Sequence, residues 1–158
     1  LIEWNPLIER VRQSFYYLYI WTEEFGSTVA TTLAKYDCEV IAIDKDESCV
    51  ERIADEVTKA IVGDTTDIEQ LKALGFEDID VAVIAIGTHL EEAVLTTMNV
   101  KDLGVPCVIA KAKNKQFSKI LEKNFITYVK TLIYQSLRYF LSFHRHCKTP
   151  YLVFYTVL

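Results

Sequence analysis

Short apolar segments alternate along the chain with segments whose apolar residues recur at helical spacing. Apolar runs without a polar face indicate strands that are buried on both sides, as in a parallel sheet covered by helices. Strands are predicted at 15–20, 38–44, 59–62, 80–86 and 107–110. Helices are predicted at 25–35, 47–55, 68–74, 89–103 and 114–122. This alternation predicts an α/β fold with a doubly wound, mainly parallel sheet and helices on both faces.

In such a sheet, ligands bind outside the carboxyl ends of the strands, where the strand order reverses. The residues that follow the predicted strands are therefore the candidates for a binding site. They are Trp21 to Gly26, Asp44, Gly63, Asp64, Gly87, Thr88 and Lys111.

Asp44 ends the buried strand 38–44 as its single acid after an apolar run. In dinucleotide-binding folds, an acid in this position accepts a hydrogen bond from a ribose hydroxyl. The alternative is that Asp44 caps the helix that begins near Asp46. The strand context supports the two interpretations equally.

Composition narrows the choice of function. The formal net charge is −5 and no basic stripe is present, which argues against binding to nucleic acid. The four cysteines form no Cys-x-x-Cys pair, and Cys38 and Cys107 begin strands, so reduced, buried thiols in a cytosolic protein are expected. The apolar window 125–143 contains Lys130 and Arg138, so no transmembrane helix is predicted there.

Neither a metal site nor catalytic residues are predicted. The segment 144–147 (His-Arg-His-Cys) offers metal ligands, but a structural zinc site normally draws on two separated pairs. No Ser-His-Asp, paired-carboxylate or Walker pattern occurs, and the first residues do not have the pattern of a signal peptide. The chain is therefore expected to be non-enzymatic.

The middle of the chain resembles the N-terminal RCK domain, also called the TrkA-N or KTN domain, most strongly over 39–122. The resemblance is carried, in order, by 38–47, 62–66, 71–75, 80–87, 95–97 and 108–114. It is closest to the Ktr-type subunits, through Ala85-Ile86-Gly87 and Lys111-Ala112. It implies a Rossmann-like, cytoplasmic regulatory subunit of a Trk or Ktr potassium uptake system, peripheral to the inner face of the cell membrane.

The resemblance also implies ligands and partners. The subunit would bind an adenine nucleotide (ATP, ADP or NAD(H)) and self-associate into a dimer, and in some members a ring. The nucleotide would bias this pairing and so gate a membrane potassium-translocating subunit. The implied cofactor-binding residues are Gly26, Asp44, Lys45, Gly63, Asp64, Ala85, Gly87 and Lys111.

Within this set the resemblance gives roles to four residues. Asp44 would bind the ribose, Asp64 would lie at the adenine, Gly87 would let the backbone approach the nucleotide, and Lys111 would face the phosphates. Each has a simpler alternative. The segment 63–66 would be a turn, Lys111 a solvated charge, and Gly87 part of a strand-to-helix turn.

The chain departs from the family in the loop after the first strand. Where the family has Gly-x-Gly-x-x-Gly, this sequence has Trp21-Thr22-Glu23-Glu24-Phe25-Gly26, so only the third glycine remains. Trp21 is bulky where a tight turn is needed, and Glu23 and Glu24 would repel a phosphate at a helix N-terminus. Two further functions therefore stay open: an assembly module that no longer binds nucleotide, and the cofactor domain of a small NAD(P)-dependent oxidoreductase.

The predicted organisation has three parts. Residues 1–14 form an N-terminal extension, 15–124 the Rossmann-like domain, and 125–158 a divergent C-terminal tail. Both ends depart abruptly from the family. They are interpreted either as divergence or as a reading-frame error that affects 1–24 and 124–158.

Overall fold

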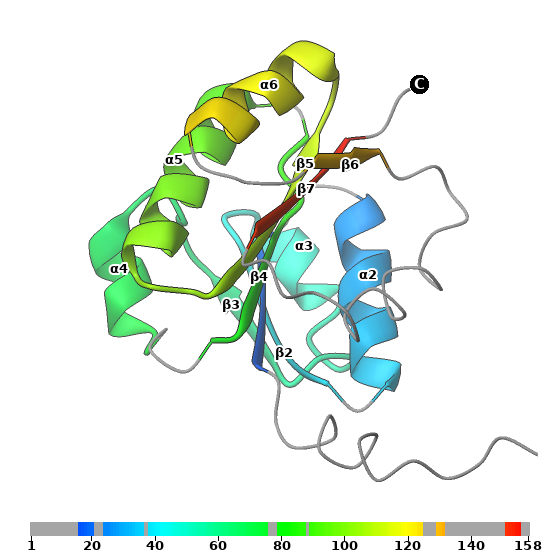
Figure 1. Ribbon diagram of the computed structural model, residues 1–158. Coiled ribbons are helices and arrows are strands. Elements are labelled where there is room, and N and C mark those ends of the chain that lie inside the picture. The colour runs from blue at the N-terminus through cyan, green and yellow to red at the C-terminus, as the bar shows by residue number, and fades with distance from the viewer. Residues whose placement is uncertain are drawn as a thin grey trace, which may run out of the picture.

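A parallel sheet forms the centre of the computed structural model (Figure 1). The structure describes residues 16–20, 24–36, 38–75, 79–87, 89–124, 129–131 and 151–155. The strands in these ranges are β1 Tyr16–Ile20, β2 Glu39–Asp44, β3 Lys59–Val62, β4 Val81–Ile84, β5 Cys107–Ala112, β6 Val129–Thr131 and β7 Tyr151–Tyr155. Their order is β3-β2-β1-β4-β5-β7-β6, and each pair of neighbours is parallel.

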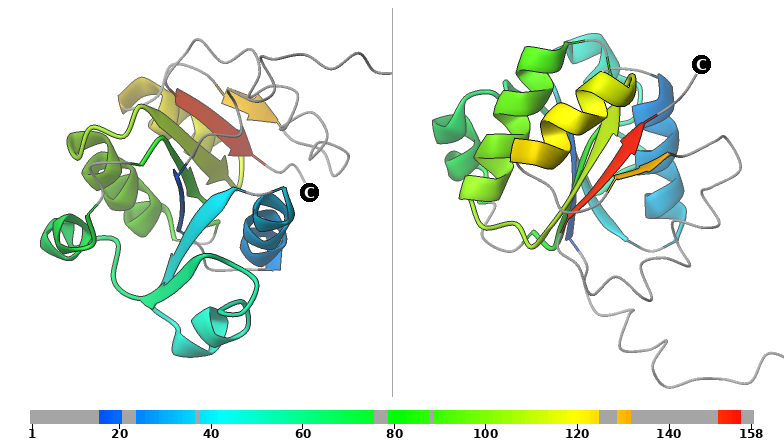
Figure 2. Two further views of the ribbon diagram at one scale, coloured as in Figure 1. Left: turned by 90° about the horizontal axis from the view of Figure 1, so that it is seen from below. Right: turned by 45° about the horizontal axis from the view of Figure 1, so that its top comes forward.

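Helices cover both faces of the sheet, as Figures 1 and 2 show. On one face lie α2 Glu24–Lys35 and α3 Glu47–Glu51. On the other lie α4 Ile68–Ala73, α5 Leu90–Asp102 and α6 Lys115–Asn124. The predicted doubly wound α/β class is confirmed.

The side chains of the central strand β4 explain why both faces are covered. Successive residues of a strand point to opposite faces of the sheet. Val83 is buried in the same cluster as Leu33 of α2, and Ile84 in the same cluster as Val100 of α5. The apolar runs of the sequence therefore supply two cores, one under each layer of helices.

Two helices end at glycine, as the sequence predicts. Gly75 and Gly104 have φ angles of 75° and 83°, a conformation that glycine adopts without the penalty of a Cβ atom. α4 and α5 stop just before them.

The helix predicted at 47–55 is shorter than expected. After Glu51 the backbone forms bonds to the third residue back, such as the bond from Glu56 N–H to the carbonyl oxygen of Ile53 at 2.8 Å. This tighter winding turns the chain toward β3 while Ile53 stays in the core. The periodicity of apolar residues continued through the turn and so hid the end of the helix.

The predicted strands 80–86 and 107–110 have different bounds in the structure. β4 ends at Ile84, because its neighbours β1 and β5 pair with it only to that point. β5 continues to Ala112, because β7 pairs with it from Val108 to Ala112. The sequence analysis had left β7 unassigned.

The described cysteines form no disulfide bond with one another, and they are not fully buried. Cys38, Cys49 and Cys107 all have intermediate exposure, since they lie at the margins of the core under α2 and α3. The prediction of buried thiols was therefore wrong, because these thiols are only partly buried. Among the described residues, no helix is long and apolar enough to span a bilayer, and most of the window 125–143 lies outside these residues.

Candidate functional site

The carboxyl ends of β1, β2 and β4 lie side by side. β1 pairs with β2 on one side and with β4 on the other, so the chain order of the strands reverses there. This is the point at which open α/β sheets bind ligands. The residues that follow these strands are the starting point for a site.

Asp44 is the last residue of β2, and its side chain is almost completely buried, with 3% of its surface exposed. One carboxylate oxygen, Oδ1, accepts a hydrogen bond from the backbone N–H of Asp46 at 2.9 Å. The other, Oδ2, has no hydrogen-bond partner among the described residues. An acceptor buried without a partner is rare and costly, so a hydroxyl group that reached this oxygen would satisfy it.

Burial also changes the acidity of this group. Loss of solvation raises the pKa of the Asp44 carboxyl above its ordinary value, and the backbone N–H of Asp46 only partly opposes this. The N-cap of α3 is Asp46, which accepts from the backbone N–H of Ser48 at 2.9 Å. The helix-capping role considered for Asp44 thus belongs to its neighbour.

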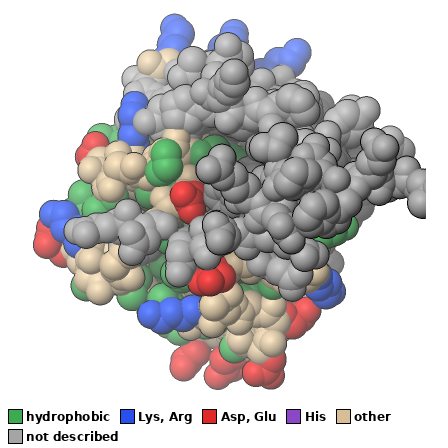
Figure 3. Space-filling view, turned by 60° about the horizontal axis from the view of Figure 1, so that its bottom comes forward, with side chains coloured by type: hydrophobic (Ala, Val, Ile, Leu, Met, Phe, Trp, Pro, Cys, Tyr) green, Lys and Arg blue, Asp and Glu red, His purple; other side chains and the backbone are tan. Residues whose placement is uncertain are grey.

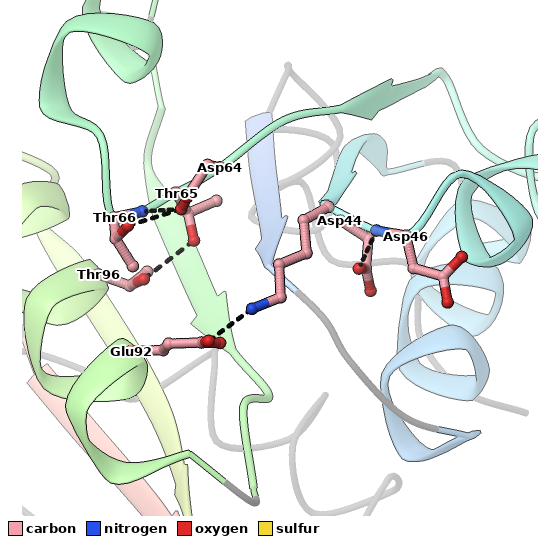
Figure 4. Close-up of polar contacts among 8 residues, drawn as sticks. Asp44, Asp46, Asp64, Thr65, Thr66, Glu92 and Thr96 are labelled. Atoms are coloured by element: carbon pink, nitrogen blue, oxygen red, sulfur yellow. Dashed lines mark hydrogen bonds and ion pairs between the residues drawn. The ribbon is translucent and has the colours of Figure 1, made fainter.

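Lys45 extends from the end of β2 toward α5. Its amino group forms an ion pair with Glu92 at 2.5 Å, marked by the dashed line at Glu92 in Figure 4. The hydrogen bond to Glu92 raises the pKa of Lys45, and the negative charges of Asp64 and Asp44 add to this effect. Lys45 therefore lies within the field of three acids.

The segment after β3 forms a turn. Asp64 Oδ1 accepts hydrogen bonds from the backbone N–H and the hydroxyl of Thr66, at 2.9 and 2.7 Å. These bonds lower the pKa of Asp64. The N-cap of α4 is Asp67, so the segment is both a turn and a lead-in to a helix.

Gly63 precedes this turn without needing to be glycine for its own conformation. A Cβ atom at Gly63 would lie 3.5 Å from Ile43 and 3.6 Å from Gln70, which are ordinary contacts. Its φ angle is outside the left-handed region. The direction of the missing side chain is thus filled by Ile43 and Gln70, and neither this contact nor the backbone conformation requires glycine at this position.

Helix α5 holds this turn through a row of polar side chains. The hydroxyls of Thr96 and Thr65 are 2.9 Å apart and buried (Figure 4). The side-chain amide of Asn99 donates to the carbonyl oxygens of Thr65 and Thr66, at 3.1 and 2.9 Å. Glu92, Thr96 and Asn99 follow one another at the spacing that places residues on one side of a helix.

The other predicted cofactor residues lie along the same edge of the sheet. Gly26 is buried in α2, and Ala85 and Gly87 are buried just after β4. Lys111 lies in β5 one residue beyond the pairing with Ile84 and is half-buried. Residues 21–23 of the altered loop and the segment 144–147 lie outside the described residues.

The sequence analysis did not identify Glu92, Thr96 and Asn99 as part of the site. They contact residues 31 to 47 positions away in the sequence, and single-sequence patterns do not report such pairs. One signal was present, namely their spacing at i, i+4 and i+7 within a predicted helix. A polar row of this kind indicates a helix side that faces polar groups rather than the core.

The charged side chains on the face drawn in Figure 3 agree with the negative net charge of the chain. Figure 3 shows lysine and arginine side chains spaced apart along the upper edge and the sides of the described part of one face, with acidic side chains at its lower edge, at the left and near its middle. A nucleic-acid backbone requires clustered cations. The described part of this face has no such cluster.

The strand order and the helices on both faces together define a Rossmann-like α/β domain. The family model of the TrkA-N domain matches residues 22–131. The chain belongs to this family, which confirms the resemblance recognised in the sequence.

A curated relative agrees with this assignment. The chain is 37% identical over 99 residues to Ktr system potassium uptake protein C of Bacillus subtilis, covering 63% of this chain and 45% of the relative. The chain thus spans less than half the length of that relative.

The structural matches show the fold. The NAD(P)-binding domain of an exopolyphosphatase-related protein from Archaeoglobus fulgidus has a TM-score of 0.62 at 19% identity, covering 85% of this chain and 98% of that one. The GsuK channel bound to NAD has a TM-score of 0.61 at 15% identity, covering 75% of this chain and 23% of the channel.

Proposed function

We propose that this chain is a nucleotide-binding regulatory domain of a potassium transporter or channel. The observation that carries the proposal is the buried Oδ2 atom of Asp44, which has no hydrogen-bond partner among the described residues and lies at the reversal point of a TrkA-N sheet. A ribose hydroxyl is the donor that such an acid accepts in this class of fold. The relatedness to Ktr potassium uptake proteins supports the transport context.

In this proposal the domain senses and does not catalyse. An adenine nucleotide, ATP, ADP or NAD(H), binds over the strand ends with Asp44 at its ribose. Gly26, Gly63, Ala85 and Gly87 allow close approach of the backbone, and Asp64 and Lys111 lie at the two ends of the nucleotide. Binding favours one pairing of two such domains, and this pairing acts on a membrane potassium-translocating partner. The domain would then work at the cytoplasmic face of the membrane.

The test is calorimetric titration of the full chain with ATP, ADP and NADH. We expect saturable binding of at least one of them, weakened about tenfold or more in Asp44→Asn, because a charged acceptor is replaced by a neutral one. Asp55→Asn is the matched control, since Asp55 is exposed in the turn after α3 and should leave affinity unchanged.

A second function has one observation in its favour, the sequence Trp21-Thr22-Glu23 in place of the glycines. Under it, the domain keeps the scaffold as an assembly module and binds no nucleotide. Absence of binding by all three nucleotides to folded protein would support the assembly module and end the sensor proposal.

A further inference from the structure

The ion pair between Lys45 and Glu92 lies directly beside Asp44. Lys45 follows Asp44 in the chain, and Glu92 belongs to the first turn of α5. The amino group of Lys45 interacts electrostatically with Asp44 and Asp64 as well as with Glu92. The cation nearest the strand-end acid is therefore already neutralised by a side chain from another element.

A free cation at this place would have a defined chemical effect. In dinucleotide-binding folds, a basic side chain near the strand-end acid accommodates a phosphate on the 2′-oxygen of the ribose. Lys45 has the position for this role. A 2′-phosphate would have to displace Glu92 from Lys45 or lie close to its carboxylate, and like charges repel.

The position of Glu92 is fixed by the rest of α5. Thr96 and Asn99, one and two turns further on, are bonded to the turn after β3. These contacts set the rotation of the helix about its axis. Glu92 is thus presented to Lys45 by the helix itself.

We propose that Glu92 is a specificity-determining residue, which by neutralising Lys45 selects nucleotides whose adenosine ribose carries no phosphate. This inference rests on the proposed nucleotide-binding function. The selection is graded, because the side chains of Lys45 and Glu92 are 54% and 29% exposed and such pairs are weak. The expected contribution of Glu92 is about fivefold in relative affinity.

The experiment compares NADH with NADPH, which differ by this one phosphate. The full chain is titrated with each by fluorescence, as wild type, Glu92→Gln and Glu91→Gln. Glu91 is the matched control, because it lies in the same first turn and its loss changes net charge and helix dipole equally. We expect Glu92→Gln to shift the affinity ratio about fivefold toward NADPH, and Glu91→Gln to leave the ratio unchanged.

Two further measurements show whether the shift acts through Lys45. In the double variant Lys45→Gln with Glu92→Gln, the ratio should return to that of the wild type. The shift in Glu92→Gln should also shrink at high salt, since ions screen exposed charges. If Glu92 affected only folding, the affinity ratio would not return to the wild-type value in the double variant, and the shift would not shrink at high salt.

The failures are distinguishable. If NADH binds but Glu92→Gln leaves the ratio unchanged, or Glu91→Gln shifts it equally, the specificity inference is wrong and the nucleotide-binding function stands. If the wild type binds neither dinucleotide nor ATP or ADP, both are wrong.

Discussion

At the scale of single residues, the buried carboxylate of Asp44 lowers the stability of the folded protein and could accept a hydrogen bond from a ligand. Its carboxylate is buried, one of its oxygens has no partner in the part of the chain that the structure describes, and burial raises its pKa. A group of this kind makes the unliganded protein less stable than it could be. A buried acid with a raised pKa at the reversal point of the sheet is therefore a candidate binding residue.

The first prediction follows from this cost. Asp44→Asn should raise the free energy of unfolding of the unliganded protein at neutral pH, by on the order of 1 kcal/mol, because the amide keeps the shape without the buried charge. Urea denaturation at a series of pH values measures this. The raised pKa means that the folded state holds a proton more tightly than the unfolded state, so wild-type stability rises as the pH falls through the folded pKa toward 3.8.

The advantage of the variant should therefore disappear below pH 3.8, where the carboxyl is protonated in both states. Asp55→Asn again serves as the control, with no change in stability expected. If the Asp44→Asn variant were less stable than the wild type at neutral pH, the prediction would be wrong, and the charged carboxylate would have a hydrogen-bond partner in the folded protein.

The strand-end acid could be predicted from the sequence, but its surroundings could not. Asp44 is marked by its own strand, since an apolar run ends there in one acid. Glu92 lies 47 positions away from Lys45, and nothing local marks the pair. A site residue that is marked by its own segment can be predicted from the sequence. A contact between residues of two distant segments cannot.

At the scale of elements, the turn after β3 depends on α5. Two carbonyl oxygens of this turn, those of Thr65 and Thr66, receive hydrogen bonds from one side chain, Asn99. The bounds of α5 were predicted closely because its residues repeat at helical spacing and Gly104 ends it. Its attachment to the turn needed the folded arrangement.

The second prediction concerns this attachment. Asn99→Ala should lower stability by about 1–2 kcal/mol, because it leaves two carbonyl oxygens without a donor. Hydrogen exchange should quicken at the amides of Thr66 and Asp67, which are bonded to Asp64 within the same turn. Gln116→Ala, which removes an exposed amide from α6, is the control. If the hydrogen-exchange rates of both amides were unchanged in Asn99→Ala, the turn would be stable without the hydrogen bonds from Asn99.

At the scale of the whole molecule, the sheet includes part of what the sequence analysis set apart as a tail. β6 and β7 lie within 125–158, and β7 runs between β5 and β6. The signal was available, since Tyr151–Tyr155 is a run of aromatic and apolar residues suited to a strand. Its lack of likeness to the family hid its structural role.

The third prediction tests whether β7 is integral to the domain. Val153 pairs with Ala110 of β5 and Val129 of β6, and proline cannot donate to a ladder between two neighbours. Val153→Pro should therefore lower the free energy of unfolding by roughly 3 kcal/mol more than Val153→Ala, measured by urea denaturation. Equal midpoints for the two variants would show that the domain is complete without β7.

The place of β7 also determines when the domain can finish folding. β1, β2 and β3 pair in chain order, whereas β4 pairs with β1, and β6 gains its neighbour β7 only after the residues between Thr131 and Tyr151 have been synthesised. Until then, β5 presents an unpaired edge to other chains in the cell, and such edges promote aggregation. The edge of β5 is therefore covered only once β7 has been made and has paired with it.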